Sequence, residues 1–143
     1  MSEPVFISEE EVRAIHCRGL ETHGGMDGVR DPGILASALS QPEAAWYYTQ
    51  ADLFALAAGY AFHIAQNQPF IDGNKRAAVT TSLTFLEVNG VNTSGCPDDV
   101  IYDALIAVAE KRLDKAGLAE VFRSQLAHRT HPRLATKRHE MTQ

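Results

Sequence analysis

The sequence predicts an all-α domain of about six helices, and three observations support this fold class. Apolar residues recur at three-to-four spacing through most of the chain. Residues that cap helices precede several of these stretches. No convincing stretch alternates apolar and polar residues as a half-buried strand does, apart from a short extended piece expected at residues 91–93. We therefore expect a helical bundle with a central helix-loop-helix.

The first helix is predicted to begin at Ser8, because Ser8 and Glu11 have the spacing of a capping box. In a capping box the serine hydroxyl accepts from a first-turn amide, and the glutamate reaches back to the amide of the serine. Val12 and Ile15 then begin an apolar stripe. The glycine-rich residues 24–28 end this pattern and predict a flexible turn.

A second helix is predicted to begin at Asp31 and Pro32, which have the order of an N-cap residue and a proline at the first helical position. We expect this helix to be short and to stop before Pro42, because proline lacks the N–H group that the helix interior needs. The apolar stripe consists of Ile34, Leu35, Ala38 and Leu39.

Two longer helices are predicted next, and together they form the central hairpin. Asp52 can cap the first of them, and residues 66–72 interrupt it. The second runs from about Asn74 to Asn89–Gly90, because this pair is typical of a helix C-terminus. The stripe of the first helix contains Leu53, Leu56, Ala57, Tyr60, Ala61 and Ile64, and that of the second contains Val79, Leu83 and Leu86.

Two further helices complete the predicted bundle. The fifth begins at residues 97–99, where two acidic side chains would interact favourably with the helix dipole. The sixth covers about residues 118–125. The predicted domain spans residues 1–127, and the polar, basic residues 128–143 are expected to form a flexible tail.

Composition narrows the possible functions. The chain has 143 residues and a net charge of −5, which disfavours a dedicated binder of nucleic acids or anionic membranes. Cys17 and Cys96 are far apart and have no partner at the spacing of a metal or redox motif. Since we see neither a signal peptide nor an apolar stretch of about 20 residues, we expect a cytoplasmic protein with two reduced thiols.

The strongest chemical signal is the run Gln-Pro-Phe-Ile-Asp-Gly-Asn-Lys-Arg at residues 68–76. The first amides of a helix have no intrahelical partner and lie at the positive end of its dipole, so the turn at Gly73 and Asn74 is a candidate anion site. Lys75 and Arg76 add two cations. The planar guanidinium group can bind two phosphate oxygens at once.

Asp72 adds a hard oxygen ligand to this run. Magnesium is usually held by one or two carboxylates together with substrate phosphates, so an aspartate beside two cations fits a metal–phosphate site better than a surface ion pair. The triplet Asp-Gly-Asn alone is more often an ordinary turn with a capping asparagine. The complete run between two amphipathic helices favours the functional interpretation.

These residues resemble a known family. The motif N-x-P-F-x-D-G-N-K-R-A-A, followed by a helix that ends F-L-E-x-N-G, is similar to the Fic/Doc family and in particular to its Doc (death-on-curing) toxin branch. The Fic-type core reads H-P-F-x-[D/E]-G-N-G-R, and the Doc branch has lysine at the second glycine, as Lys75 does here. Residues 24–33 resemble the region where family members have a flap beside the active site. The resemblance covers roughly residues 5–126.

The resemblance implies a Fic-fold domain that binds a nucleoside triphosphate with magnesium. Doc-type members phosphorylate a threonine of elongation factor Tu and block translation, using ATP, whereas Fic-type members transfer AMP to a protein hydroxyl. Transferred onto this sequence, the resemblance gives Asp72 as the Mg²⁺ ligand, Gly73, Asn74 and Lys75 as the anion-binding turn, Arg76 as a phosphate contact and Phe70 as the anchor of the loop.

Gln68 departs from the family pattern, because it occupies the position of the histidine that acts as the general base. Glutamine has no nitrogen that titrates near neutral pH, and the loss of a general base costs about 10²–10⁴ in rate. We therefore expect nucleotide binding with weak or absent transfer. His63 lies five residues earlier, on another helical face, and is no convincing substitute. His16 and His23 are expected to be structural or exposed.

Three functions therefore stay open: a Doc-like phosphotransferase with a compromised base, a Fic-type adenylyltransferase, and a nucleotide- or antitoxin-binding module without catalysis. The sequence does not separate a natural Gln68 from an introduced one. Self-inhibited family members carry the motif S/T-x-x-x-E-G/N, and residues 136–141 match only its first part. A separate small antitoxin is therefore the expected regulator.

Overall fold

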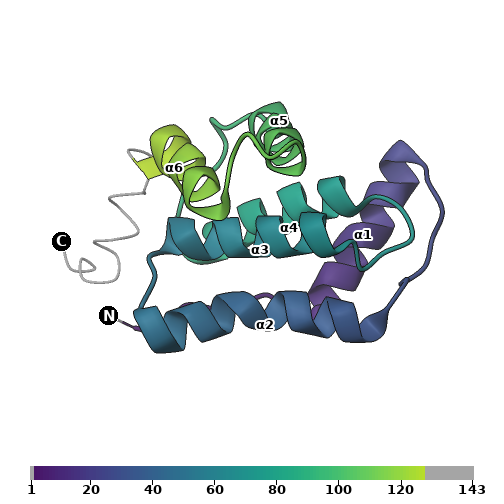
Figure 1. Ribbon diagram of the computed structural model, residues 1–143, viewed down its shortest axis with the longest axis horizontal. Coiled ribbons are helices and arrows are strands. Elements are labelled where there is room, and N and C mark those ends of the chain that lie inside the picture. The colour runs from purple at the N-terminus through teal and green to yellow at the C-terminus, as the bar shows by residue number, and fades with distance from the viewer. Residues whose placement is uncertain (1, 128–143) are drawn as a thin grey trace.

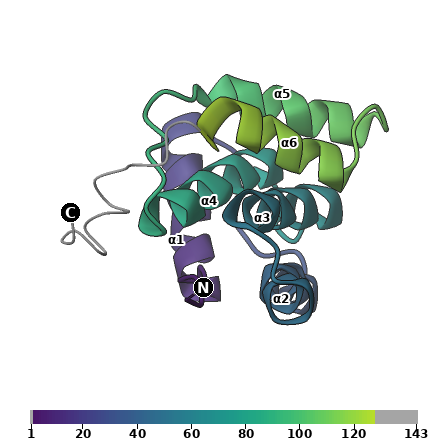
Figure 2. The same ribbon diagram turned by 90° about the vertical axis from the view of Figure 1, so that its left-hand side faces the viewer.

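The computed structural model describes residues 2–127 and arranges six helices in three layers (Figure 1). The middle layer consists of α3 (Leu53–Asn67) and α4 (Asn74–Val88), with α2 (Pro32–Thr49) on one side. On the other side lie α5 (Asp98–Ala109) and α6 (Lys115–Leu126), while α1 (Glu9–His23) crosses α4 (Figure 2). The predicted all-α fold with a central helix-loop-helix is therefore confirmed.

Two of the predicted segments are not helices, and their outcomes differ. The predicted tail at residues 128–143, with the partial inhibitory motif at residues 136–141, lies outside the described residues. The extended piece expected at residues 91–93 forms no strand in the described part of the chain. Within residues 2–127, no helix combines the length and the apolar character that a membrane span requires.

The helix ends follow local rules that the sequence displays. Ser8 Oγ accepts from the Glu11 amide at 3.1 Å, and the Ser8 amide donates to Glu11 Oε1 at 2.8 Å, which completes the predicted capping box. Asp52 caps α3 by accepting from Ala55 N at 2.9 Å. At the end of α4, Gly90 has φ of +96° and the amides of residues 90 and 91 bond back to the last turn.

The predicted end of the second helix before Pro42 is wrong, because α2 continues through Pro42 to Thr49. Proline in a helix interior costs about 3 kcal/mol. Here the Pro42 ring is buried against α3, where a methyl group added at Gly59 would lie 3.5 Å from Pro42 Cγ. The packing of α2 on α3 therefore outweighs the local preference of proline, and the ring lies beside Gly59 on α3.

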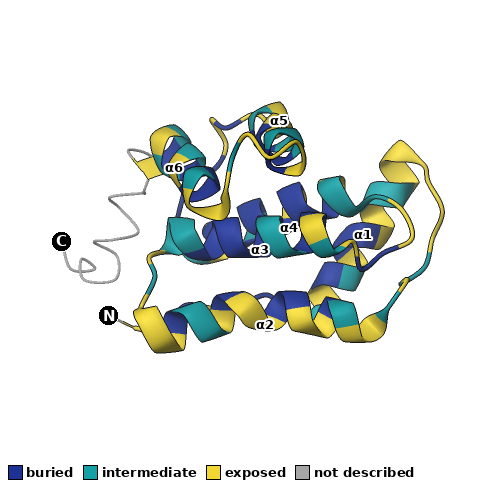
Figure 3. Cartoon of the chain, viewed as in Figure 1, coloured by how far each residue is buried: buried dark blue, intermediate teal, exposed yellow. Residues whose placement is uncertain are grey.

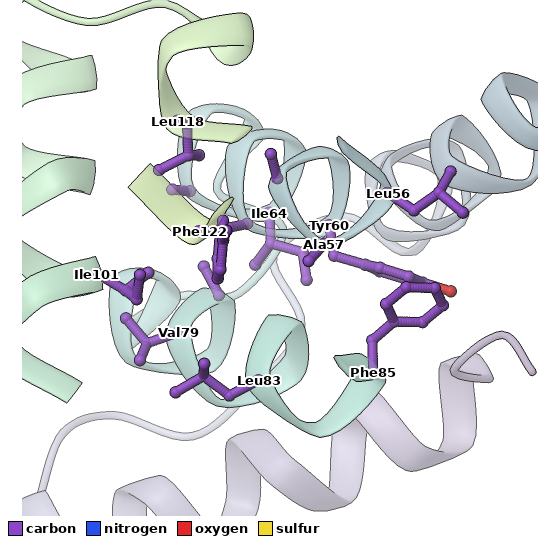
Figure 4. Packing of buried hydrophobic residues seen from close by; sticks show 14 of the residues in the cluster. Leu56, Ala57, Tyr60, Ile64, Val79, Leu83, Phe85, Ile101, Leu118 and Phe122 are labelled. Carbon is purple, nitrogen blue, oxygen red and sulfur yellow. The ribbon is translucent and has the colours of Figure 1, made fainter. Parts of the chain in front are cut away.

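The core lies around α3, which contacts α2, α4, α5 and α6 (Figure 3). Tyr60 and Phe85 face each other across α3 and α4 with ring centroids 5.1 Å apart (Figure 4). The Tyr60 hydroxyl accepts from the amide of Ile7 at 2.9 Å, which attaches the N-terminal segment to the core. Leu118 and Phe122 bring α6 into the same cluster. The hairpin of α3 and α4, which carries the loop at residues 68–73, therefore lies at the centre of the fold.

We expect the protein to lose stability as the pH falls from about 6.5 through about 4, because of His63 on α3. Burial, and secondly the charge of Lys115, lower the pKa of His63 from 6.5 to about 4. Between these two pH values the unfolded chain binds more protons than the folded one, so the free energy of unfolding decreases as the pH falls. Allowing for partial exposure of the ring, we expect a loss of about 2 kcal/mol.

Urea unfolding at pH 7 and pH 4 measures this loss. In the parent protein the Lys115 ammonium lies 3.1 Å from His63 Nε2. The matched control is His63→Gln, which keeps a polar side chain near this ammonium but removes the titrating imidazole. The variant should lose less stability than the parent between the two pH values. An equal loss in both proteins would show that His63 does not cause the pH dependence.

Candidate active-site loop

The loop at residues 68–73 connects the two central helices and starts and ends in left-handed backbone. Gln68 is the C-cap of α3, with φ of +50°, and its amide donates to Ile64 O at 3.1 Å. Gly73 is the N-cap of α4, with φ of +77°, a conformation that residues with a β-carbon rarely adopt. No side chain caps α4, so the amides of its first turn stay free where the loop joins the helix.

The ring of Phe70, which the resemblance gives as the anchor of the loop, is buried. It is 1% exposed and stacks on the imidazole of His16, with ring centroids 3.8 Å apart and planes 7° apart. His16 Nε2 lies 2.7 Å from the carbonyl oxygen of Asp72. Because a carbonyl only accepts, Nε2 carries the proton and donates it. His16 on α1 therefore holds the loop at two points, and its predicted structural role agrees with this position.

Asn74 uses its side chain to close the loop. Its Oδ1 accepts from Phe70 N at 3.0 Å, and its Nδ2 donates to Phe70 O at 3.0 Å. Both groups of the amide are therefore engaged with the backbone of the loop. For an anion, Asn74 has its backbone amide to offer, and the side chain supports the turn.

The connection between α1 and α2 lies alongside the loop (Figure 1). Val29 forms an isolated antiparallel bridge with Phe70, and Ile71 N donates to Gly28 O at 3.0 Å. The Arg30 guanidinium donates to the carbonyl oxygens of Asn67 and Gln68, each at 2.8 Å. The glycine-rich segment predicted to be a flap thus packs on the loop, and Arg30 fixes the backbone at Gln68.

Asp72 is exposed and links the loop to the same connection. Oδ1 accepts from Gly73 N at 2.9 Å, and Oδ2 accepts from Met26 N at 3.2 Å. Gly25 lies so close that an added β-carbon would be 3.0 Å from Asp72 Oδ2. Each carboxylate oxygen accepts one hydrogen bond here and can still offer a lone pair to a cation.

A cavity of about 310 Å³ lies between α1 and α4 and borders Gly73, and we refer to it as the α1–α4 cavity. Of the predicted site residues, Gly73 and Arg76 line it, whereas Gln68, Asp72, Asn74 and Lys75 do not. The described residues that line it are Ile15, His16, Arg18, Gly19, Leu20, Thr22, His23, Gly24, Gly73, Arg76, Ala77 and Thr80.

The two predicted cations differ in their surroundings. Arg76 is exposed, and its Cζ lies 5.3 Å from the centroid of the Tyr102 ring on α5, a cation–π distance. Lys75 is half-buried and lies outside the α1–α4 cavity. The structure therefore brings Gly73 and Arg76 to one cavity and places Gln68 and Asp72 on the side of the flap.

Sequence reasoning missed the roles of Arg30 and His16 in shaping the loop. The signal for His16 was its position one helical turn after Val12, on the buried face of α1. Arg30 gave no signal, because its partners are carbonyl groups that are 37 and 38 residues away in sequence.

Within residues 2–127, no group of three or more His, Cys, Asp or Glu side chains could hold a metal ion.

Comparisons with known proteins agree with the predicted resemblance. The model of the Fic/DOC family matches residues 6–86. The protein kinase doc of Escherichia phage P1 is 31% identical over 118 residues, which cover 82% of this chain and 92% of the phage protein. The toxin Doc of Mycolicibacterium smegmatis is 36% identical over 99 residues, which cover 67% of this chain and 76% of that toxin.

Proposed function

Because the chain belongs to the Fic/Doc family, we propose that it is a Doc-like toxin whose fold transfers phosphate from ATP to a protein hydroxyl. The proposed target is a translation factor such as elongation factor Tu, and the regulator is a small antitoxin. The family resemblance supports these two partners. The relative from phage P1, which aligns with 82% of this chain, is named a protein kinase. This name favours phosphate transfer over adenylyl transfer.

One observation supports the transfer function above the others: the loop combines a left-handed glycine at the start of α4 with a carboxylate and a cation. Gly73 directs the free amides of the first turn of α4 toward the mouth of the loop. Asp72 and Arg76 lie on its two sides. This arrangement suits a phosphate that carries a metal ion, because free amide donors, a cation and a hard oxygen ligand all come from residues 72–76, where the loop joins α4.

Asp72 fits the role of the magnesium ligand. Its carboxylate is exposed, and each oxygen accepts one hydrogen bond, from Gly73 N and from Met26 N. Magnesium bound there would neutralise charge on the phosphates. The remaining ligands would be phosphate oxygens and water, which agrees with a site built on a single carboxylate.

In the proposed reaction, the hydroxyl oxygen of the target forms a bond to the γ-phosphorus of ATP. The bond from this phosphorus to the bridging oxygen breaks, and ADP leaves. The hydroxyl proton must pass to a base at position 68, where the family has histidine. Gln68 can accept a hydrogen bond from the hydroxyl but cannot take up its proton near neutral pH. This chain is therefore proposed to bind nucleotide and to transfer phosphate slowly or not at all.

The decisive experiment incubates Gln68→His protein with a cell lysate and either γ-³²P-ATP or α-³²P-ATP. We expect a protein band labelled from the γ-phosphate. A band labelled from the α-phosphate would identify the chain as an adenylyltransferase and contradict the proposal. If neither label is transferred while nucleotide still binds, the chain is a binding module. Asp72→Asn in the same background is the control and should remove the band.

A further inference from the structure

The α1–α4 cavity concentrates positive charge on an acidic chain. The net charge of the protein is −5, yet no Asp or Glu is among the described residues that line this cavity. Its ionisable lining consists of Arg18, His23 and Arg76, together with the buried His16. Within residues 2–127, neither Arg18 nor Arg76 forms a salt bridge. Arg76 also borders a smaller cavity that Asp98 and Asp99 line, but neither carboxylate is within salt-bridge distance of it. Two guanidinium groups that form no salt bridge favour an anionic ligand.

The two arginines come from the two helices that form the walls. Arg18 lies in the second half of α1, and Arg76 lies in the first turn of α4. Between them the floor is made of small residues, since Gly19, Gly73 and Ala77 all line the cavity. A methyl group added at Gly19 would meet no atom within 4 Å. The space is therefore open on the α1 side, and Arg18 and Arg76 both border it.

The cavity continues directly from the candidate transfer site. Gly73 is the N-cap of α4 and also lines the cavity, and Asp72 lies next to it on the side of the flap. Thr80 adds a hydroxyl group on α4, whereas the Thr22 hydroxyl already donates to Arg18 O at 3.1 Å. A phosphate chain that begins at the free amides of α4 can thus continue between the two helices, where Arg18, Arg76 and Thr80 offer donors.

On the basis of the proposed function, we infer that the α1–α4 cavity binds the phosphate chain of the nucleotide, with Arg18 as a phosphate-binding residue outside the family motif. Arg76 holds the chain from α4, and Arg18 holds it from α1. Transfer takes place at the flap side of Gly73, and the phosphates that are not transferred lie in the cavity. His23 at the rim contributes a further donor for an oxygen of the chain.

Calorimetry with the protein as it exists, in magnesium-containing buffer, tests this inference with three probes: a non-hydrolysable ATP analogue, inorganic triphosphate and adenosine. Arg18→Gln should weaken the binding of the first two by roughly 10- to 100-fold, because it removes charge-assisted hydrogen bonds. Arg76→Ala is the positive control and should weaken both as well. Arg13→Gln is the matched control, since it removes the same charge from α1 at a residue that pairs with Glu9.

A second variant tests the cavity by shape. Gly19→Met fills open space on a helix, so the fold should be kept, which the melting temperature measures. We expect it to abolish binding of the ATP analogue and of triphosphate. Normal binding by Gly19→Met or by Arg18→Gln would overturn the assignment of the cavity, while the proposed transfer at the loop would stand.

The same measurements separate the two proposals. If triphosphate binds through Arg18 but Gln68→His protein transfers no phosphate, the cavity is a phosphate site and the proposed function is wrong. If affinity depends on Arg76 but not on Arg18, the phosphates lie elsewhere and the inference is wrong. If the parent protein binds neither the ATP analogue nor triphosphate, both proposals are wrong.

Discussion

Gln68→His is expected to raise the rate of phosphate transfer by about 10²–10⁴-fold over the parent chain. The imidazole introduces a group that titrates near neutral pH and can take the proton of the target hydroxyl. The measurement is the initial rate of γ-³²P incorporation into the target, recorded as a function of pH. The rate of the histidine variant should increase with pH as the imidazole loses its proton.

The structure indicates that position 68 tolerates this exchange. The side chain is exposed, and the backbone has φ of +50°, a conformation in which histidine is enriched. Arg30 bonds to the carbonyl oxygen of residue 68, so the exchange leaves this contact intact. Gln68→Asn is the matched control, because it keeps an amide and also suits left-handed backbone. If the asparagine variant gains as much activity as the histidine variant, proton transfer is not what the parent lacks.

Phe70→Ala should destabilise the fold by about 3–5 kcal/mol and also abolish nucleotide binding. The ring is 1% exposed, so its removal leaves a cavity in the core. His16 would lose its stacking partner, and the contact of His16 with Asp72 would no longer be positioned. Urea unfolding and titration with the ATP analogue measure the two effects.

Phe122→Ala separates loss of the loop from loss of stability. Phe122 is fully buried on α6, so its removal should cost a similar 3–5 kcal/mol. It lies on α6, where its neighbour Arg123 bonds to Asp52 at the start of α3, whereas the loop follows the other end of α3. At a temperature where both variants are folded, Phe122→Ala should keep its affinity for nucleotide. Equal losses of affinity in the two variants would show that Phe70 acts through stability alone.

The helices could be predicted from the sequence where their ends depend on neighbours in the chain. The capping box at Ser8 and Glu11, the cap at Asp52 and the glycine turn at Gly90 each involve residues within one helical turn. Pro42 shows the limit of this approach. Its ring packs beside Gly59 on another helix, and local spacing contains no information about that contact.

The candidate site divides in the same way. The motif at residues 68–76 is contiguous, so its carboxylate, glycine and cations were visible in the sequence. Arg30, His16 and Arg18 were not, because their relation to the loop arises only when α1 and the following connection pack against α4. Each of the three approaches the loop through tertiary packing, and no periodic pattern distinguishes them from ordinary surface or core residues.

The supports of the loop also bear on the order of folding. His16 contacts Asp72 across 56 residues of sequence, and Arg30 contacts Gln68 across 38. Contacts of such separation require the closure of long chain segments, which is entropically costly and slow compared with helix formation. We therefore expect the loop to take its final shape late, after the hairpin of α3 and α4 has formed. A newly made chain would then pass through a stage in which the hairpin of α3 and α4 has formed but the loop is not yet shaped to bind a ligand.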